Sequence, residues 1–247
     1  MSARSYLVYR LTAALGSMGT LAGNERRGSD DWPARSAVTG MLGAALGVHR
    51  TDRSGFASLE SDYAIGLSRL QLGPILTDFH TAQTVPTSAA KRPSSRSDAL
   101  ALGKAKGSLG TVTVITHREY HQECMFDVAV LAIAEEPQWS LDVIRDALLR
   151  PHFTLYFGRK ACPLDLPLGP RILDADDSIK AFDFYRRSIP TPSSATSGEF
   201  LLDARLVDEN CDQGQAIVRR DGVVDRERWT FADREYLLLN VSPEDVS

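Results

Sequence analysis

Apolar residues in the first third of the chain recur with two different periods. Residues 5–12 (SYLVYRLT) are rich in aromatic and branched side chains, which predicts a strand. In 35–46 the apolar residues recur every three or four positions, and this spacing predicts a helix that Pro33 opens and Gly47 closes. Residues 61–72 (SDYAIGLSRLQL) alternate between apolar and polar, so we predict a second strand there.

The middle of the chain continues this succession of elements. Residues 111–116 (TVTVIT) and 125–134 (MFDVAVLAIA) alternate and predict two more strands. Ser140 can cap a second helix, whose apolar stripe ends at Pro151, and 153–157 (FTLYF) predicts a further short strand. The order strand, helix, strand, strand, helix, strand is typical of an α+β, ferredoxin-like (RRM-like) split βαβ unit.

A long polar excursion interrupts this unit between its second and third strands. Residues 83–110 hold few large apolar side chains, and a loop of that length inside a compact domain usually has a function or is disordered. We predict a ferredoxin-like domain over 1–175 and a small β-rich part over 176–247. The short strands predicted for this second part lie at 179–187, 200–207, 214–219 and 235–241.

Composition and net charge narrow the class of protein. The 247 residues are 43% hydrophobic, and the net charge of −4 argues against a surface that is basic all over, although not against one basic face. The cysteines Cys124, Cys162 and Cys211 are far apart and form no C-x-x-C pair, which disfavours a disulfide framework or a zinc site. No apolar run is long enough to span a bilayer, and the N-terminus lacks a cleavable signal. We expect a cytoplasmic protein with no membrane partner, no metal and no cofactor.

Charge is segregated along the sequence. Between Gln83 and Arg118 there are six Lys and Arg residues and one acid, Asp98, whereas the region from Phe200 onward holds eleven acids and six arginines. A basic excursion on an otherwise acidic protein favours a polyanion partner, because neutralised phosphates release counterions. The alternative is a loop that carries charge only to stay solvated.

The segment 157–169 (FGRKACPLDLPLG) concentrates candidate chemistry. Gly158 would let the backbone approach a ligand closely, and Arg159 and Lys160 could clamp phosphates, unless the segment is only a tight turn with exposed cations. The same cations would lower the pKa of the Cys162 thiol and make it a candidate nucleophile. A cysteine that merely packs in the core is the commoner case.

The polar loop 16–33 offers a second anion site. Met18, Gly19, Arg26 and Arg27 lie in this loop before the first helix, and Arg35 opens that helix. A helix N-terminus with added arginines suits an anion, and plain helix capping is the alternative.

Histidines flank the basic excursion on both sides. His80 precedes it, and His117, Tyr120 and His121 follow it. Such groups could serve as acid and base in metal-independent RNA cleavage, or they could stack on bases and bind phosphates without any chemistry. Ordinary polar residues at strand ends are the third interpretation.

Five blocks of sequence together resemble a known family. They are 10–20 (RLTAALGSMGT), 32–48 (WPARSAVTGMLGAALGV), 78–83 (DFHTAQ), 117–130 (HREYHQECMFDVAV) and 149–168 (LRPHFTLYFGRKACPLDLPL). In this order they resemble the Cas-five family of the RAMP superfamily, in particular its members in type I-E CRISPR Cascade complexes.

This resemblance implies a ferredoxin-like fold with an inserted β-hairpin thumb, placed here at about 83–110. It implies a non-catalytic subunit that caps the 5′ handle of the CRISPR RNA and lies beside the backbone subunit CasC and the large subunit CasA. The assembled complex would then reach target DNA. Another subunit processes the precursor RNA in this subtype, but relatives in another subtype cleave the repeat, which leaves a metal-independent endoribonuclease as the alternative.

The resemblance and the charge pattern together give one set of candidate RNA-binding residues, and no catalytic residue. The set is Met18, Gly19, Arg26, Arg27, Arg35, Ser36, His80, Thr81, Gln83, Lys91, Arg92, Arg96, Lys104, Lys106, His117, Arg118, Tyr120, Gly158, Arg159, Lys160, Ala161 and Cys162.

Overall fold

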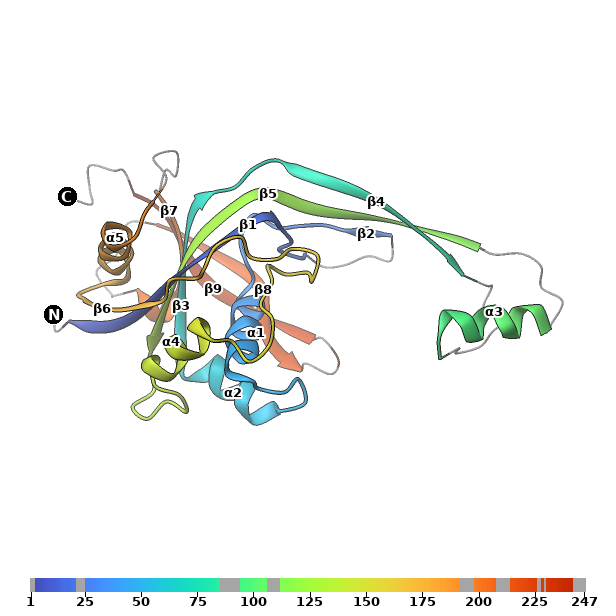
Figure 1. The fold of residues 1–247 in the computed structure, drawn as a ribbon. Helices are drawn as coiled ribbons and strands as arrows, with labels where there is room; N and C mark the ends of the chain where they lie inside the picture. Colours follow the sequence, from blue (N-terminus) through green and yellow to red (C-terminus); the bar gives the residue numbers. More distant parts are fainter. Residues whose placement is uncertain are drawn as a thin grey trace.

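The computed structural model describes residues 3–20, 25–84, 94–105, 112–191, 198–207, 214–225, 228 and 230–241. Its strands join one nine-stranded, largely antiparallel sheet in the order β6-β1-β5-β3-β7-β9-β8, with β2 and β4 paired to β5 (Figure 1). The strands are β1 (Arg4–Gly16), β2 (Arg26–Arg27), β3 (Tyr63–Gln71), β4 (Ile75–Thr84), β5 (Val112–Ala132), β6 (Arg171–Ala175), β7 (Glu199–Asp203), β8 (Gln215–Asp225) and β9 (Thr230–Asn240). The helices are α1 (Arg35–Leu46), α2 (Arg53–Ser61), α3 (Arg96–Ala105), α4 (Leu141–Leu149), α5 (Ser178–Ser188) and the short 3-10 helix η1 (Ala204–Leu206). The predicted combination of helices with a sheet is confirmed at this level.

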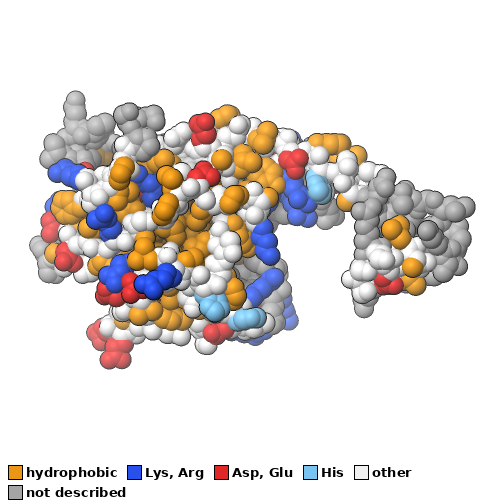
Figure 2. Space-filling model, viewed as in Figure 1, with side chains coloured by type: hydrophobic (Ala, Val, Ile, Leu, Met, Phe, Trp, Pro, Cys, Tyr) orange, Lys and Arg blue, Asp and Glu red, His pale blue; other side chains and the backbone are white. Residues whose placement is uncertain are grey.

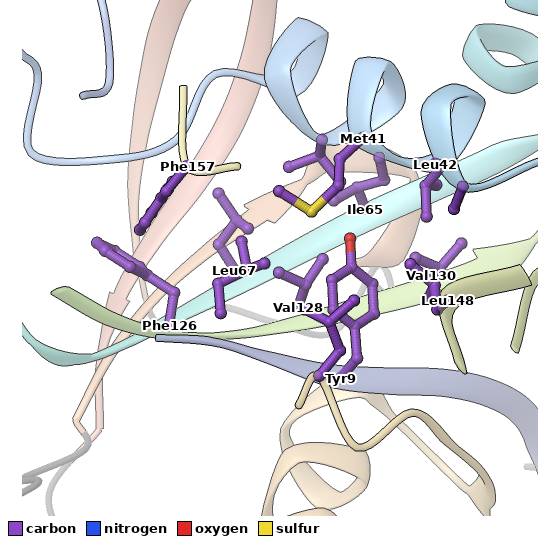
Figure 3. Close-up of a cluster of buried hydrophobic side chains, with 14 of the residues drawn as sticks. Tyr9, Met41, Leu42, Ile65, Leu67, Phe126, Val128, Val130, Leu148 and Phe157 are labelled. Atoms are coloured by element: carbon purple, nitrogen blue, oxygen red, sulfur yellow. The ribbon is translucent and has the colours of Figure 1, made fainter. Parts of the chain in front are cut away.

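The larger core lies between the sheet and helices α1, α2 and α4. Met41 and Leu42 of α1 face Ile65 of β3 and Val130 of β5 (Figure 3). Each fully buried Leu, Ile or Met stabilises the fold by about 1.5–3 kcal/mol. The apolar stripe that predicts α1 is therefore the stripe that covers the sheet. The range 35–46 and the end at Gly47, in the left-handed conformation (φ 78°), are confirmed, whereas Pro33 lies before the N-cap residue Ala34 and does not open the helix.

A second core covers the opposite face of the sheet. Because side chains alternate along a strand, Tyr6 and Val8 of β1 point away from the first core and pack with Phe182 and Tyr185 of α5. β1 is therefore buried on both faces, which explains why its sequence reads as a nearly continuous apolar run.

β5 is 21 residues long and belongs to two parts of the molecule. Its second half pairs with β1 and β3 in the body, whereas Val112–His121 pairs with β4. β4 and this half of β5 leave the body as a two-stranded ribbon, with α3 beyond its tip (Figure 1). We call this ribbon, Ile75–Thr84 with Val112–His121, the arm. The excursion expected over 83–110 thus begins at the outer end of the arm.

The prediction of a strand at 153–157 is wrong. The backbone N–H groups of His152 and Phe153 donate to the carbonyls of Ala45 and Ala44 at the end of α1, over 3.0 and 3.1 Å. The chain at 152–153 therefore gives the Ala45 carbonyl a partner and adds a second donor to the Ala44 carbonyl, which also accepts from the Gly47 N–H. β6 takes the place beside β1.

The prediction of a strand at 179–187 is also wrong, because this segment lies in α5. Its buried residues Ala181, Phe182 and Tyr185 share one face of a helix, and the Asp177 side chain accepts from the Lys180 N–H at 2.8 Å as the N-cap.

Three further differences concern strands and helices that the pattern missed or divided. The two strands predicted at 111–116 and 125–134 are one strand, β5, and the prediction omitted α2, α3, β2, β4 and β6. In the second predicted part, β7, β9 and β8 continue the same sheet through the β3–β7 pairing. The domain boundary between 175 and 176 stays a prediction. Of the helices in the described ranges, none has the length and apolar character required to cross a membrane.

Candidate nucleic-acid interface

Three segments that are distant in sequence meet where the arm joins the body. We call this region, around β2 and residues 117–121 of β5, the root of the arm. The end of β1 contacts the turn at 157–162 through the Ser17 N–H, which donates to the Phe157 carbonyl at 3.1 Å. β2 lies parallel to β5 and extends its pairing through the His117 N–H, which donates to the Glu25 carbonyl at 2.7 Å. The root therefore combines the polar loop, the base of the arm and the Gly158 turn.

One face of the root carries an aromatic and cationic row. Strand register places Arg26 of β2, His117 of β5 and Phe79 of β4 side by side, and directly partnered positions share a face of a sheet. The rings of Phe79 and His117 pack edge to face with centroids 5.4 Å apart. Phe79 is 59% exposed and Arg26 is exposed, so this row presents a ring surface flanked by a cation.

The opposite face of the root carries a second row of Arg27, Arg118 and Asp78. Arg27 is exposed, and Arg118 is half-buried with a buried Nε that has no hydrogen-bond partner in the described part of the chain. A buried donor without a partner is costly, and an outside phosphate oxygen could reach only the less shielded part of this guanidinium. Figure 2 shows Lys and Arg side chains gathered where the arm meets the body and along the body below it.

The turn at 157–162 is held tightly against the end of β1. The Phe157 N–H donates to the Cys162 carbonyl at 2.8 Å, and the Cys162 N–H donates to the Arg159 carbonyl at 2.8 Å. Gly158 adopts φ +84° and touches Ser17. Lys160 and Ala161 stand exposed at the tip of the turn.

Cys162 is a core residue, which agrees with the packing cysteine given as the commoner case and argues against the candidate nucleophile. Its side chain is fully buried, and burial raises the pKa of the thiol above its ordinary value even though Arg159 acts in the opposite direction. Cys124 lies in the same core, and burial raises the pKa of its thiol to about 12. Since the thiolate is the nucleophile, neither cysteine is prepared for nucleophilic chemistry.

Arg35 does not offer its guanidinium to an outside anion, contrary to expectation. The side chain is buried and forms ion pairs with Glu60 (2.8 Å) and Asp203 (3.1 Å), and it also donates to the Tyr63 carbonyl at 2.7 Å. It connects α1 with α2, β3 and β7, so its role is structural. Ser36, beside it in the first turn of α1, is half-buried.

Met18 is also part of the core rather than of the surface. Its side chain is 2% exposed, while its backbone N–H donates to the Ser29 hydroxyl at 2.9 Å and its carbonyl accepts from the Asp30 N–H at 2.6 Å. Gly19 next to it is exposed, and a Cβ there would meet nothing within 4 Å.

The remaining candidates lie on the arm and beyond it. His80 and Thr81 are exposed on β4, and Gln83 lies near the end of that strand. Register pairs His80 with Thr116, one position from His117, so His80 and His117 point to opposite faces of the arm. Tyr120 is buried beneath Arg159. Arg96 and Lys104 lie in α3, whereas Lys91, Arg92 and Lys106 lie outside the described residues.

Sequence reasoning missed Phe79 and the apolar character of the arm. The exposed large apolar residues of the arm are Ile75, Leu76, Phe79, Val114 and Ile115. The apolar residues of ILTDFHTAQT do not alternate with polar ones, because Ile75, Leu76, Phe79 and Ala82 are divided between both faces, and β4 was therefore not recognised as a strand. In the part of the chain that the structure describes, no group of three or more His, Cys, Asp and Glu side chains is arranged to hold a metal ion.

Comparisons with known proteins agree in pointing to one family. A family model described as CRISPR-associated protein (Cas_Cas5) matches residues 6–234. The CRISPR system Cascade subunit CasD of Escherichia coli (strain K12) is 30% identical over 190 residues, which cover 74% of this chain and 77% of that protein. A chain in a solved CRISPR RNA-guided surveillance complex matches with a TM-score of 0.62 and 21% identity, covering 97% of this chain and 92% of that one. A chain in a crystal structure of a Cas protein matches with a TM-score of 0.57 and 19% identity, covering 98% and 97%.

Proposed function

The chain belongs to the Cas5 family of CRISPR-associated proteins, and from that membership we propose that it is a subunit of a Cascade-type surveillance complex that binds the 5′ handle of the CRISPR RNA. The observation that carries the proposal is the row of Arg26, His117 and Phe79 at the root of the arm. Unpaired bases stack on exposed aromatic rings, and a neighbouring cation binds the phosphate between them. The cationic row on the opposite face, Arg27 with Arg118, supplies further phosphate contacts.

The fold supports the same assignment. The four strands in the order β6-β1-β5-β3, with α1 and α4 in the two crossovers, correspond to the order 4-1-3-2 of a ferredoxin-like unit. We propose that the arm, with α3 at its end, is the thumb of this family, which extends the thumb expected over 83–110 toward the body. Its exposed apolar residues on both faces suit a ribbon that becomes covered in an assembly, because an isolated two-stranded ribbon is marginally stable in water.

We propose binding without cleavage. General acid–base cleavage needs both proton-transfer groups within hydrogen-bond reach of one phosphodiester. His80 and His117 point to opposite faces of the arm, and Tyr120 is buried beneath Arg159. In this proposal the protein has CasC and CasA as neighbours and meets target DNA through the assembled complex, as the family resemblance implies. The name of the relative CasD, a Cascade subunit, supports membership of such a complex.

A binding and cleavage assay with synthetic CRISPR repeat RNA tests this function. The protein is purified in mild salt and incubated in EDTA with the repeat RNA labelled at its 5′ end. We expect retention of intact RNA that weakens steeply as salt rises. Discrete cleavage products that disappear in His117→Ala would support the endoribonuclease instead, and failure to retain RNA at low salt would contradict binding by this chain.

A further inference from the structure

Arg159 has a different task from its neighbour Lys160. From its contacts we infer that Arg159 is a positioning residue, which fixes β2 against β5 and so holds Arg26 and Arg27 on the two faces of the root where the proposed RNA contacts lie. This inference rests on the proposed function. It replaces the expectation from the sequence that both cations of the Gly158 turn clamp phosphates directly.

The guanidinium of Arg159 spans two strands. Its Nη1 donates to the Glu119 carbonyl of β5 at 3.3 Å, and its Nη2 donates to the Arg27 carbonyl of β2 at 3.4 Å. Its Cζ lies 4.7 Å from the centre of the Tyr120 ring. The planar group is thus fixed by two backbone acceptors and one ring face, a geometry that lysine cannot reproduce because its ammonium is a compact point charge.

β2 needs such support because it is only two residues long. Its register with β5 consists of the pairs Arg26 with His117 and Arg27 with Arg118. The next residues are tied by the Ser29 N–H, which donates to the Glu119 carboxylate at 3.3 Å. The Thr20 N–H also donates to the Gly28 carbonyl at 3.4 Å, so the chain after β2 is held at more than one place. Arg159 acts on the carbonyl of Arg27 itself, so its loss would loosen β2 at that residue.

Lys160 provides the matched comparison on the same turn. It is adjacent in sequence, carries the same charge and is exposed, and it forms no ion pair within the described residues. A direct phosphate contact is therefore the role that its position allows. Removal of its charge should reduce the number of phosphate contacts between the protein and the RNA by one.

The experiment is a mutant cycle read by salt dependence of binding to synthetic repeat RNA. Arg159→Lys keeps the charge, Arg26→Gln with Arg27→Gln removes the two cations of β2, and the triple variant combines them. Lys160→Gln, alone and combined with the β2 pair, is the control. For single-stranded RNA each lost phosphate contact lowers the slope of log K against log salt by about 0.7.

If Arg159 positions β2, Arg159→Lys weakens binding about tenfold and lowers the slope by up to about 1.4, although the charge is unchanged. The triple variant then binds no more weakly than the double variant Arg26→Gln, Arg27→Gln. Lys160→Gln, in contrast, lowers the slope of that double variant by a further amount of about 0.7. Wild-type binding by Arg159→Lys, or an additive triple variant, would overturn the inference.

Hydrogen exchange separates this inference from the proposed function. Arg159→Lys is expected to speed exchange of the His117 amide, which is bonded to the Glu25 carbonyl, while Lys160→Gln leaves it unchanged. This result would support the positioning of β2 even if the wild-type protein retained no RNA. Unchanged exchange in Arg159→Lys would overturn it even if RNA binding were found.

Discussion

A Cβ added to residue 158 would lie 1.7 Å from the carbonyl oxygen of Ser17. Gly158 also adopts φ +84°, in the left-handed region that other residues enter at a cost. Glycine is therefore required here by both backbone conformation and space, because the turn must lie directly on the end of β1.

Gly158→Ala should lower the free energy of unfolding by about 2–4 kcal/mol and disturb the root of the arm. Thermal unfolding checks this, with Gly19→Ala as the matched control because a Cβ at residue 19 would meet nothing within 4 Å. Equal melting temperatures for the two variants would show that the turn is not packed as described.

Phe79→Ala should weaken RNA binding without destabilising the protein. The ring is 59% exposed and edge to face with His117, so it contributes little to the core but offers a stacking surface worth about 1–3 kcal/mol per base. Titration of labelled repeat RNA measures the loss, which Phe79→Tyr should largely restore. Leu76→Ala, an exposed apolar residue whose register places it on the other face, is the control. An equal loss in both variants would argue against stacking at Phe79.

Acid should destabilise the protein through Asp203. Burial alone would raise the pKa of this carboxyl, but hydrogen bonds from Arg205 and the charges of Arg205 and Arg35 outweigh burial and hold the pKa below its ordinary value. A depressed pKa in the folded state means that the unfolded state binds the proton more readily. The stabilisation is therefore present above the unfolded pKa of about 3.9 and is lost as the pH falls through the folded value.

Asp203→Asn should consequently cost about 3 kcal/mol at pH 7, because Arg35 is left buried with one partner fewer, and its stability should decline less steeply in acid. Urea unfolding from pH 7 to pH 3 measures both effects. Asp176→Asn removes an exposed pair with Lys180 and should change little. An acid dependence identical to that of the wild type would show that Asp203 is not linked to folding in this way.

Cys162 should react slowly with iodoacetamide in the native protein. Its thiol is buried and its pKa lies above the ordinary value, so little thiolate is present at pH 8. Alkylation followed by mass spectrometry should show modification at the rate of global unfolding, and urea should accelerate it. Rapid alkylation of Cys162 under native conditions would restore the reactive cysteine that the structure argues against.

Local sequence signals predicted α1 correctly because its ends depend on neighbouring residues, such as Gly47 in a left-handed cap. Family resemblance identified the segments that meet at the root of the arm. The roles of individual side chains could not be found in this way. In the sequence alone, Arg35 looks available to bind an anion. The fold brings Glu60 and Asp203, which are 25 and 168 positions away, into contact with it.

The same limit applies to Arg159 and to the short strands. The carbonyl acceptors of Arg159 belong to residues 132 and 40 positions away, so its bridging role has no local signature. β2 is two residues long and exists only through its pairing with β5. The segment 153–157 has residues that are common in strands, yet the N–H of its first residue donates to a carbonyl at the end of α1. Residue propensities cannot predict such a contact between distant segments.

The most direct test of RNA capture at the root of the arm is to purify a tagged copy from its native host in mild salt and to sequence the RNA that accompanies it. A matched copy carrying Arg26→Gln, Arg27→Gln and His117→Ala is purified in parallel. We expect short RNAs with one common 5′ end in a multi-subunit particle, and loss of that RNA from the copy that carries Arg26→Gln, Arg27→Gln and His117→Ala. An RNA-free monomer, or RNA retained equally by both proteins, would contradict this expectation.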